Sequence, residues 1–69
     1  MKNNKLHELY AEALAADELF QTAVVKQFGP KKAGDKRYES RLHNEETKAA
    51  ALNFQHAMNA YFVEFRKSA

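Results

Sequence analysis

The segment that decides the fold of this 69-residue chain is Gly29-Pro30-Lys31-Lys32-Ala33-Gly34-Asp35-Lys36-Arg37-Tyr38-Glu39-Ser40-Arg41-Leu42-His43, which we call the connection. It contains both glycines, the single proline and five of the eleven Lys and Arg residues. Gly29 can adopt the left-handed conformation that follows a helix, and Pro30 cannot continue a helix. Because an amphipathic helical pattern lies on each side, the connection must turn one helix back onto the other.

The residues before the connection predict one long helix over about residues 4–28. Its apolar positions recur at alternating spacings of three and four, which indicates a helix with one buried face. This stripe consists of Leu6, Leu9, Ala13, Ala16, Phe20, Ala23 and, at its polar edge, Gln27. Asn3 or Asn4 can cap the helix, because an Asn side chain accepts from the free N–H groups of the first turn.

The residues after the connection predict a second helix over about residues 45–67. Its stripe consists of Thr47, Ala51, Phe54, Met58, Tyr61 and Phe65. This 4-3-4-3-4 spacing suits nearly antiparallel packing against a neighbouring helix at about +20°. Asn44 is a good N-cap, with Glu45 and Glu46 at the positive end of the helix dipole and Arg66 and Lys67 at the negative end.

The connection has fifteen residues, whereas helix–helix connections typically have ~2–8, so we expect a short helical turn within it. Asp35 is placed to cap a turn over residues 36–42, in which Tyr38 and Leu42 would be four residues apart and anchor the connection onto the hairpin. Arg37 can bond helix-terminal carbonyls. We therefore expect a structural signature that consists of Gly29, Pro30, Gly34, Asp35, Arg37 and Tyr38.

The expected fold class is all-α, an antiparallel two-helix hairpin that forms a single domain over residues 1–69. Tyr10, Leu14 and Val25 fall on one side of the first stripe and Leu19 on the other, which is more apolar surface than two helices can cover. A domain of this size is marginal alone, and the chain has no cysteine for a disulfide. Either the connection or a second copy covers the surplus, and we expect a homodimer that forms a four-helix bundle.

No pattern predicts a catalytic site or a cofactor. The G-x4-G spacing from Gly29 to Gly34 matches a phosphate-binding loop, but Asp35 and Lys36 stand where Lys and Ser or Thr are required. That motif also needs a preceding strand, whereas a helix is expected here. Helix termination followed by a turn explains these residues better.

The histidines and carboxylates are expected on the surface. His7 and His43 should lie at opposite ends of the hairpin, so they cannot share a metal ion, and we expect no metal site. The pairs Glu8/Glu12 and Asp17/Glu18 lie on or beside the polar face of the first helix. Acid–base chemistry needs a pocket that desolvates such carboxylates, and a small hairpin offers none. We therefore predict that the protein is not an enzyme.

The cations of the connection are the candidate partner-binding site. The net charge of the chain is +2, but the connection alone has +3 and the remaining residues −1. The candidate partner-binding residues are Lys31, Lys32, Lys36 and Arg41. Solvated charge is the simplest interpretation, an acidic protein surface is the second, and nucleic acid is the third. In the third case Tyr38 would offer a ring for base stacking.

We expect no membrane association. No apolar run approaches the roughly 18 residues that a spanning helix needs. Glu8 and Glu12 interrupt the N-terminal segment before the apolar core of a signal peptide could form. The expected localisation is cytoplasmic.

The sequence Phe28-Gly29-Pro30-Lys31, followed by Ala33-Gly34-Asp35-Lys36-Arg37-Tyr38, resembles small helical proteins of uncharacterised function that phages and prophages encode. In those proteins a helix ends in Gly and an Ala-Gly-Asp-x-Arg-Tyr signature follows. The resemblance covers about residues 28–38 and implies an accessory protein in the bacterial host cytoplasm, with no catalytic residue, ligand or partner transferred. We predict a non-enzymatic interaction module that acts on a host or phage protein. The alternative is a nucleic-acid-associated protein.

Overall fold

The computed structural model describes residues 4–68, with side chains described as far as Lys67. Its elements are α1 (Asn4–Phe28), α2 (Ala33–Lys36), the 3-10 turn η1 (Ser40–Leu42) and α3 (Glu45–Ser68). The predicted all-α class is confirmed, since residues 4–68 contain no strand, and both long helices have the predicted bounds within one residue. Asn4 is the first helical residue, and the predicted cap at Asn3 lies outside the described residues.

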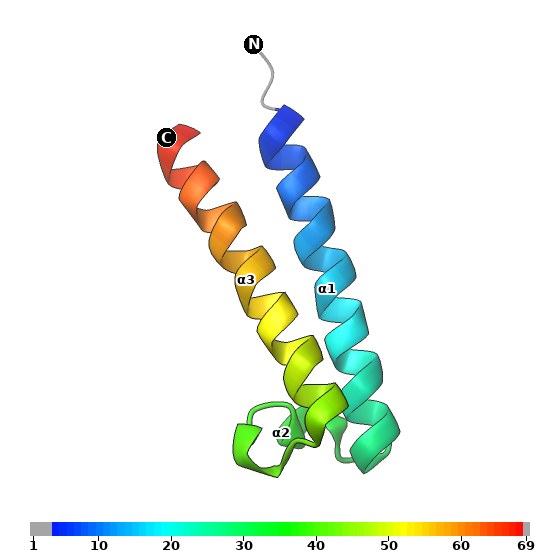
Figure 1. Cartoon of the computed structure of the whole chain (residues 1–69). Coiled ribbons are helices and arrows are strands. Elements are labelled where there is room, and N and C mark those ends of the chain that lie inside the picture. The colour runs from blue at the N-terminus through cyan, green and yellow to red at the C-terminus, as the bar shows by residue number, and fades with distance from the viewer. Residues whose placement is uncertain (1–3, 69) are drawn as a thin grey trace.

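The helices α1 and α3 run antiparallel, and the connection with α2 lies at the closed end of the hairpin (Figure 1). The two helices are closest beside the connection and separate toward the chain termini in this view. The molecule is a rod that measures 44 × 18 × 17 Å. It therefore has a closed end, where three segments meet, and an open end, where only α1 and α3 lie side by side.

The boundaries of the long helices follow from local chemistry, as predicted. Gly29 has φ +93°, and its N–H donates to the Val25 carbonyl at 2.7 Å, so α1 ends in a left-handed glycine. The Asn44 Oδ1 accepts from the Thr47 N–H at 2.8 Å, which confirms Asn44 as the N-cap of α3. Acidic residues occupy the first turn of α3 and basic residues its last turn, in agreement with the helix dipole.

The buried core lies in the half of the hairpin next to the connection. The buried side chains are Ala13, Ala16, Phe20, Ala23, Val24, Ala33, His43 and Thr47. Thr47 donates through Oγ1 to the Ala23 carbonyl at 3.4 Å, which satisfies its hydroxyl. Neither residues 4–12 of α1 nor residues 58–67 of α3 include a buried side chain. The open half of the hairpin therefore has no closed core.

The connection is ordered, but by other contacts than those predicted. Its helical turn is α2, so Asp35 lies inside the turn and the predicted cap on residues 36–42 is wrong. Tyr38 is 81% exposed and Leu42 is also exposed, so the prediction that these two side chains anchor the connection is wrong as well. Ala33 is buried against Phe20 and Val24 instead. A small side chain therefore holds the connection close to α1.

Candidate functional site

Arg37 fixes the connection to α1. Its guanidinium forms an ion pair with the Asp17 carboxylate and donates through Nη1 to Gln21 Oε1 at 2.8 Å. It also lies 4.6 Å from the ring centroid of Phe20 and 5.4 Å from that of Phe54. The side chain of Arg37 is only 16% exposed. The predicted role of Arg37 at helix-terminal carbonyls is therefore wrong. Asp17 keeps a side chain that is 40% exposed, but it is paired with Arg37.

His43 fixes the C-terminal end of the connection. It is 5% exposed and lies between the rings of Phe20 and Phe28, at centroid distances of 5.9 and 6.1 Å. Its Nε2 lies 2.8 Å from the Lys36 carbonyl, and because a carbonyl can only accept, Nε2 carries the hydrogen. Nδ1 is buried with no hydrogen-bond partner in the described part of the chain. The expectation of a surface histidine is wrong here, whereas His7 and His56 are exposed.

Gln27 joins the end of α1 to two backbone positions that lie 15 and 17 residues later in the chain. Its Nε2 donates to the Leu42 carbonyl at 2.7 Å, and its Oε1 accepts from the Asn44 N–H at 2.9 Å. One amide side chain thus links the end of α1 to η1 and to the start of α3. The sequence pattern offered one signal for this role, a polar residue in an otherwise apolar stripe beside the connection.

The four predicted partner-binding cations differ in their surroundings. Lys31, Lys32 and Arg41 are exposed, and within residues 4–68 they form no ion pair. Lys36 is half-buried, and its Nζ lies 3.4 Å from Glu39 Oε1. Three of the four cations are therefore available to a partner, whereas Lys36 already has an acidic neighbour.

The same four cations do not line one common site. One open depression of about 550 Å³ is lined by Lys32, Asp35, Lys36, Tyr38 and Glu39. A second one of about 380 Å³ is lined by Tyr38, Glu39, Ser40 and Arg41. Lys31 lines neither. The connection therefore presents dispersed cations around an exposed tyrosine, with carboxylates among them, and no enclosed anion site.

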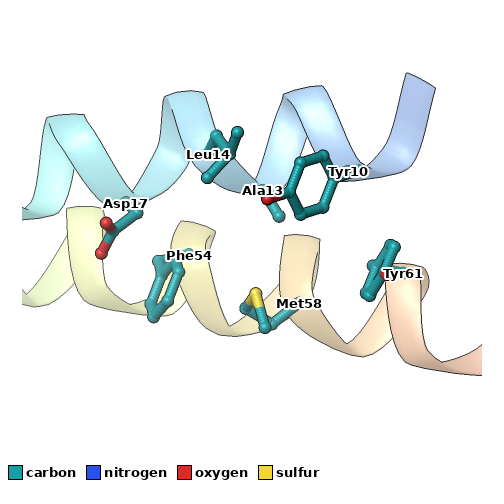
Figure 2. Close-up of a pocket in the computed structure, with 7 residues that line it drawn as sticks. All are labelled: Tyr10, Ala13, Leu14, Asp17, Phe54, Met58 and Tyr61. Atoms are coloured by element: carbon teal, nitrogen blue, oxygen red, sulfur yellow. The ribbon is translucent and has the colours of Figure 1, made fainter. Parts of the chain in front are cut away.

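A second surface, which the sequence did not predict as a site, is an apolar groove between α1 and α3 (Figure 2). The groove has a volume of about 220 Å³ and is lined by Tyr10, Ala13, Leu14, Asp17, Phe54, Met58 and Tyr61. Phe54, Met58 and Tyr61 follow one another along α3, opposite the labelled residues of α1. Asp17 is the one charged side chain in this lining, and it is paired with Arg37. The connection therefore borders the groove at its inner end.

The groove continues toward the open end of the hairpin. Tyr10 and Tyr61 have ring centroids 5.6 Å apart, and both also line a further hollow of about 190 Å³ with Leu6 and His7. The Tyr61 ring in turn contacts the exposed rings of Phe62 and Phe65 at 5.4 and 6.0 Å. The sequence identified surplus apolar residues such as Tyr10 and Leu14, but it could not show that they adjoin a groove.

Two further findings limit the kinds of site in the described residues. No group of three or more His, Cys, Asp or Glu side chains in residues 4–68 lies close enough to hold a metal ion. None of the helices in this part of the chain is long and apolar enough to cross a membrane. Comparisons with protein-family models, with curated proteins and with solved structures find no match to this chain.

Proposed function

We propose that this chain is a non-enzymatic protein-interaction module that binds an acidic protein surface through the connection. The observation that carries the proposal is that exposed, unpaired cations stand on a backbone held by buried anchors. Ala33, Arg37 and His43 hold the segment at three points along its length. Lys31 and Lys32 precede Ala33, Arg41 lies between Arg37 and His43, and all three cations are exposed. Because the backbone is ordered before binding, association with a partner does not lose the conformational entropy of ordering it.

The resemblance of residues 28–38 to small phage and prophage proteins supports a setting for this module. In this proposal the chain is an accessory protein that acts on a host or phage protein in the bacterial cytoplasm. Several of the residues that carry the resemblance have structural positions, since Gly29 ends α1 and Arg37 joins the connection to Asp17. These signature residues therefore help to fix the backbone from which the cations project.

The test is a pull-down from bacterial lysate with the wild type and a variant that carries Lys31→Glu, Lys32→Glu, Lys36→Glu and Arg41→Glu. The matched control reverses four exposed cations of the long helices, Lys5, Lys48, Arg66 and Lys67, and so has the same net charge. We expect one protein with an acidic surface to be captured by the wild type and the control but lost with the connection variant. Equal capture by all three, or equal loss in both variants, would overturn the proposal.

A second candidate function is nucleic-acid binding through the same segment. Tyr38 favours it, because this residue is 81% exposed and lines both depressions, which also include Lys32, Lys36 and Arg41. An exposed ring among cations suits an unpaired base, which stacks on the aromatic face while its phosphates meet Lys and Arg.

Fluorescence anisotropy with labelled single-stranded and duplex DNA tests this alternative. It predicts binding at low salt that weakens steeply as salt rises, and a loss with Tyr38→Ala that Tyr38→Phe does not cause. An absence of binding to both probes at low salt would rule out the nucleic-acid function.

We also propose that two copies associate into a homodimer with a four-helix arrangement. The support is that small apolar side chains fill the core whereas large apolar side chains are exposed. The buried residues include four alanines, whereas Tyr10, Leu14, Phe62 and Phe65 are exposed at the open end. A domain of this size buries only ~60% of the surface of its unfolded chain, so a second copy would add the missing apolar contacts. Sedimentation equilibrium at micromolar concentration should give twice the mass of one chain.

A further inference from the structure

The apolar groove and the rings beside it form one continuous face at the open end of the hairpin, which we call the open face. It includes Tyr10, Leu14, Met58, Tyr61, Phe62 and Phe65. Four of these side chains are exposed although they are large and apolar. Contiguous apolar surface of this kind marks an interaction site more often than isolated exposed residues do.

We propose that the open face binds the open face of a second copy, with the two hairpins antiparallel and their connections at opposite ends of the dimer. This inference rests on the proposed self-association and adds the surface and the arrangement. The occupant is a second copy because the face provides both halves of a contact. Tyr10 and Leu14 line one edge of the hollow of about 220 Å³, and because both are about half exposed they also form a ridge beside it. A two-fold axis would place the ridge of each copy in the hollow of the other.

The size and charge of the face bear on its contact with a second copy. Overlap of the open halves uses about half of one long side of the 44 × 18 Å rod, on the order of 400 Å² per copy, so the contact is smaller than a standard interface and depends on the large rings within it. The groove itself includes a single charge, Asp17, and Arg37 already neutralises it. Two such faces can therefore meet without leaving a carboxylate unpaired in the contact.

The position of the connection determines the direction of packing. Arg37 contacts Asp17 and Phe54, which also line the groove, so the connection lies on the same side of the hairpin as the open face. If the two hairpins ran parallel, both connections would occupy the same space between them. Each connection also has a charge of +3, and like charges at one end would repel. Only the antiparallel arrangement lets the open halves meet with both connections outside the contact.

Sedimentation equilibrium of Leu14→Glu and Leu19→Glu tests the surface. The two leucines lie on the same helix and are 49% and 61% exposed, but Leu14 lines the groove and Leu19 does not. We expect Leu14→Glu to raise the dimer dissociation constant by roughly a hundredfold, because a symmetric contact contains the change twice, and Leu19→Glu to leave it within about threefold. Leu14→Ala, which adds no charge and favours the helix, should weaken the dimer in the same direction.

A single spin label at Tyr38→Cys tests the direction of packing. The chain has no natural cysteine, so this exposed position takes the only label in each copy. The antiparallel arrangement predicts a label-to-label distance of more than half of the 44 Å length of one chain. A clearly shorter distance would overturn the arrangement.

The outcomes separate this inference from the proposals on which it rests. A wild-type monomer at all concentrations would refute both the homodimer and the open face as its contact. A dimer that Leu14→Glu and Leu19→Glu weaken equally, or that neither weakens, would refute only the surface. Neither result bears on binding through the connection, which the charge-reversal pull-down measures separately.

Discussion

Replacement of Arg37 by Met should destabilise the protein by about 2–3 kcal/mol. Met keeps an apolar stem over the rings of Phe20 and Phe54 but removes the charge and all five donors. The loss includes hydrogen bonds to Asp17 and Gln21, at about 1.5–3 kcal/mol each for bonds to charged groups. It also includes a cation–π contribution of about 0.5–1 kcal/mol.

We expect the total to fall below the sum of the lowest of those values, about 3.5 kcal/mol, because water can solvate the abandoned carboxylate. The Asp17 side chain is 40% exposed, and exposure of that size screens the ion pair. Urea unfolding followed by circular dichroism, at one fixed protein concentration, measures the free energy of unfolding. A loss of this size would lower the melting temperature by roughly 8–24 °C for a domain of this length.

The matched control is Arg41→Met, which removes an exposed arginine from the same segment. A surface change of this kind should alter the free energy of unfolding by less than about 0.5 kcal/mol. A double-mutant cycle of Arg37→Met with Asp17→Asn should give a coupling of about 1 kcal/mol. If Arg37→Met and Arg41→Met have the same small effect, the reasoning that Arg37 anchors the connection is refuted.

Three further predictions concern the core and the helix ends, and urea unfolding checks each. Val24→Ala should cost about 2–3 kcal/mol, because Val24 is fully buried, whereas the same change at the exposed Val63 should cost less than about 0.5 kcal/mol. Gly29→Ala should destabilise by about 1 kcal/mol, since φ is +93° there, whereas Gly34→Ala should stabilise by about 0.5–1 kcal/mol. Asn44→Ala should cost about 1 kcal/mol through the loss of the cap on Thr47, and a cost near zero would contradict that role.

The sequence predicted the long helices well because their signals are local. Gly29 and Pro30 end α1 through backbone conformation alone, and Asn44 begins α3 through a bond to a residue three positions later. The spacing of apolar residues also predicted which face of each helix is covered. These features depend on a few neighbouring residues, so they can be read without knowledge of the tertiary structure.

The interior of the connection could not be predicted in the same way. Arg37 reaches residues that are 16 and 20 positions earlier, and such contacts become apparent only once α1 and the connection are placed in space. Tyr38 was expected to anchor the segment because it is large and aromatic, but it lies in the turn after α2 and is exposed. His43 was expected on the surface because of its residue type, whereas its position next to Phe20 and Phe28 buries it.

The same distinction between local signals and long-range contacts applies to the candidate sites. The four cations of the connection were identified from charge alone, but their separation into two depressions depends on the fold. The surplus of apolar side chains was apparent from helical spacing. The groove was not, because it requires Tyr10 of α1 and Tyr61 of α3 to meet across the hairpin.

The claim that a connection fixed in place presents the cations is tested most directly by backbone 15N relaxation of the wild-type protein. The amides of Lys36, Arg37, Leu42 and His43 all donate to backbone carbonyls at 2.9–3.1 Å. We therefore predict order parameters of about 0.85 across residues 36–43, equal to those of α1 and α3. Values below about 0.6 over this segment would show a flexible loop and would contradict the account.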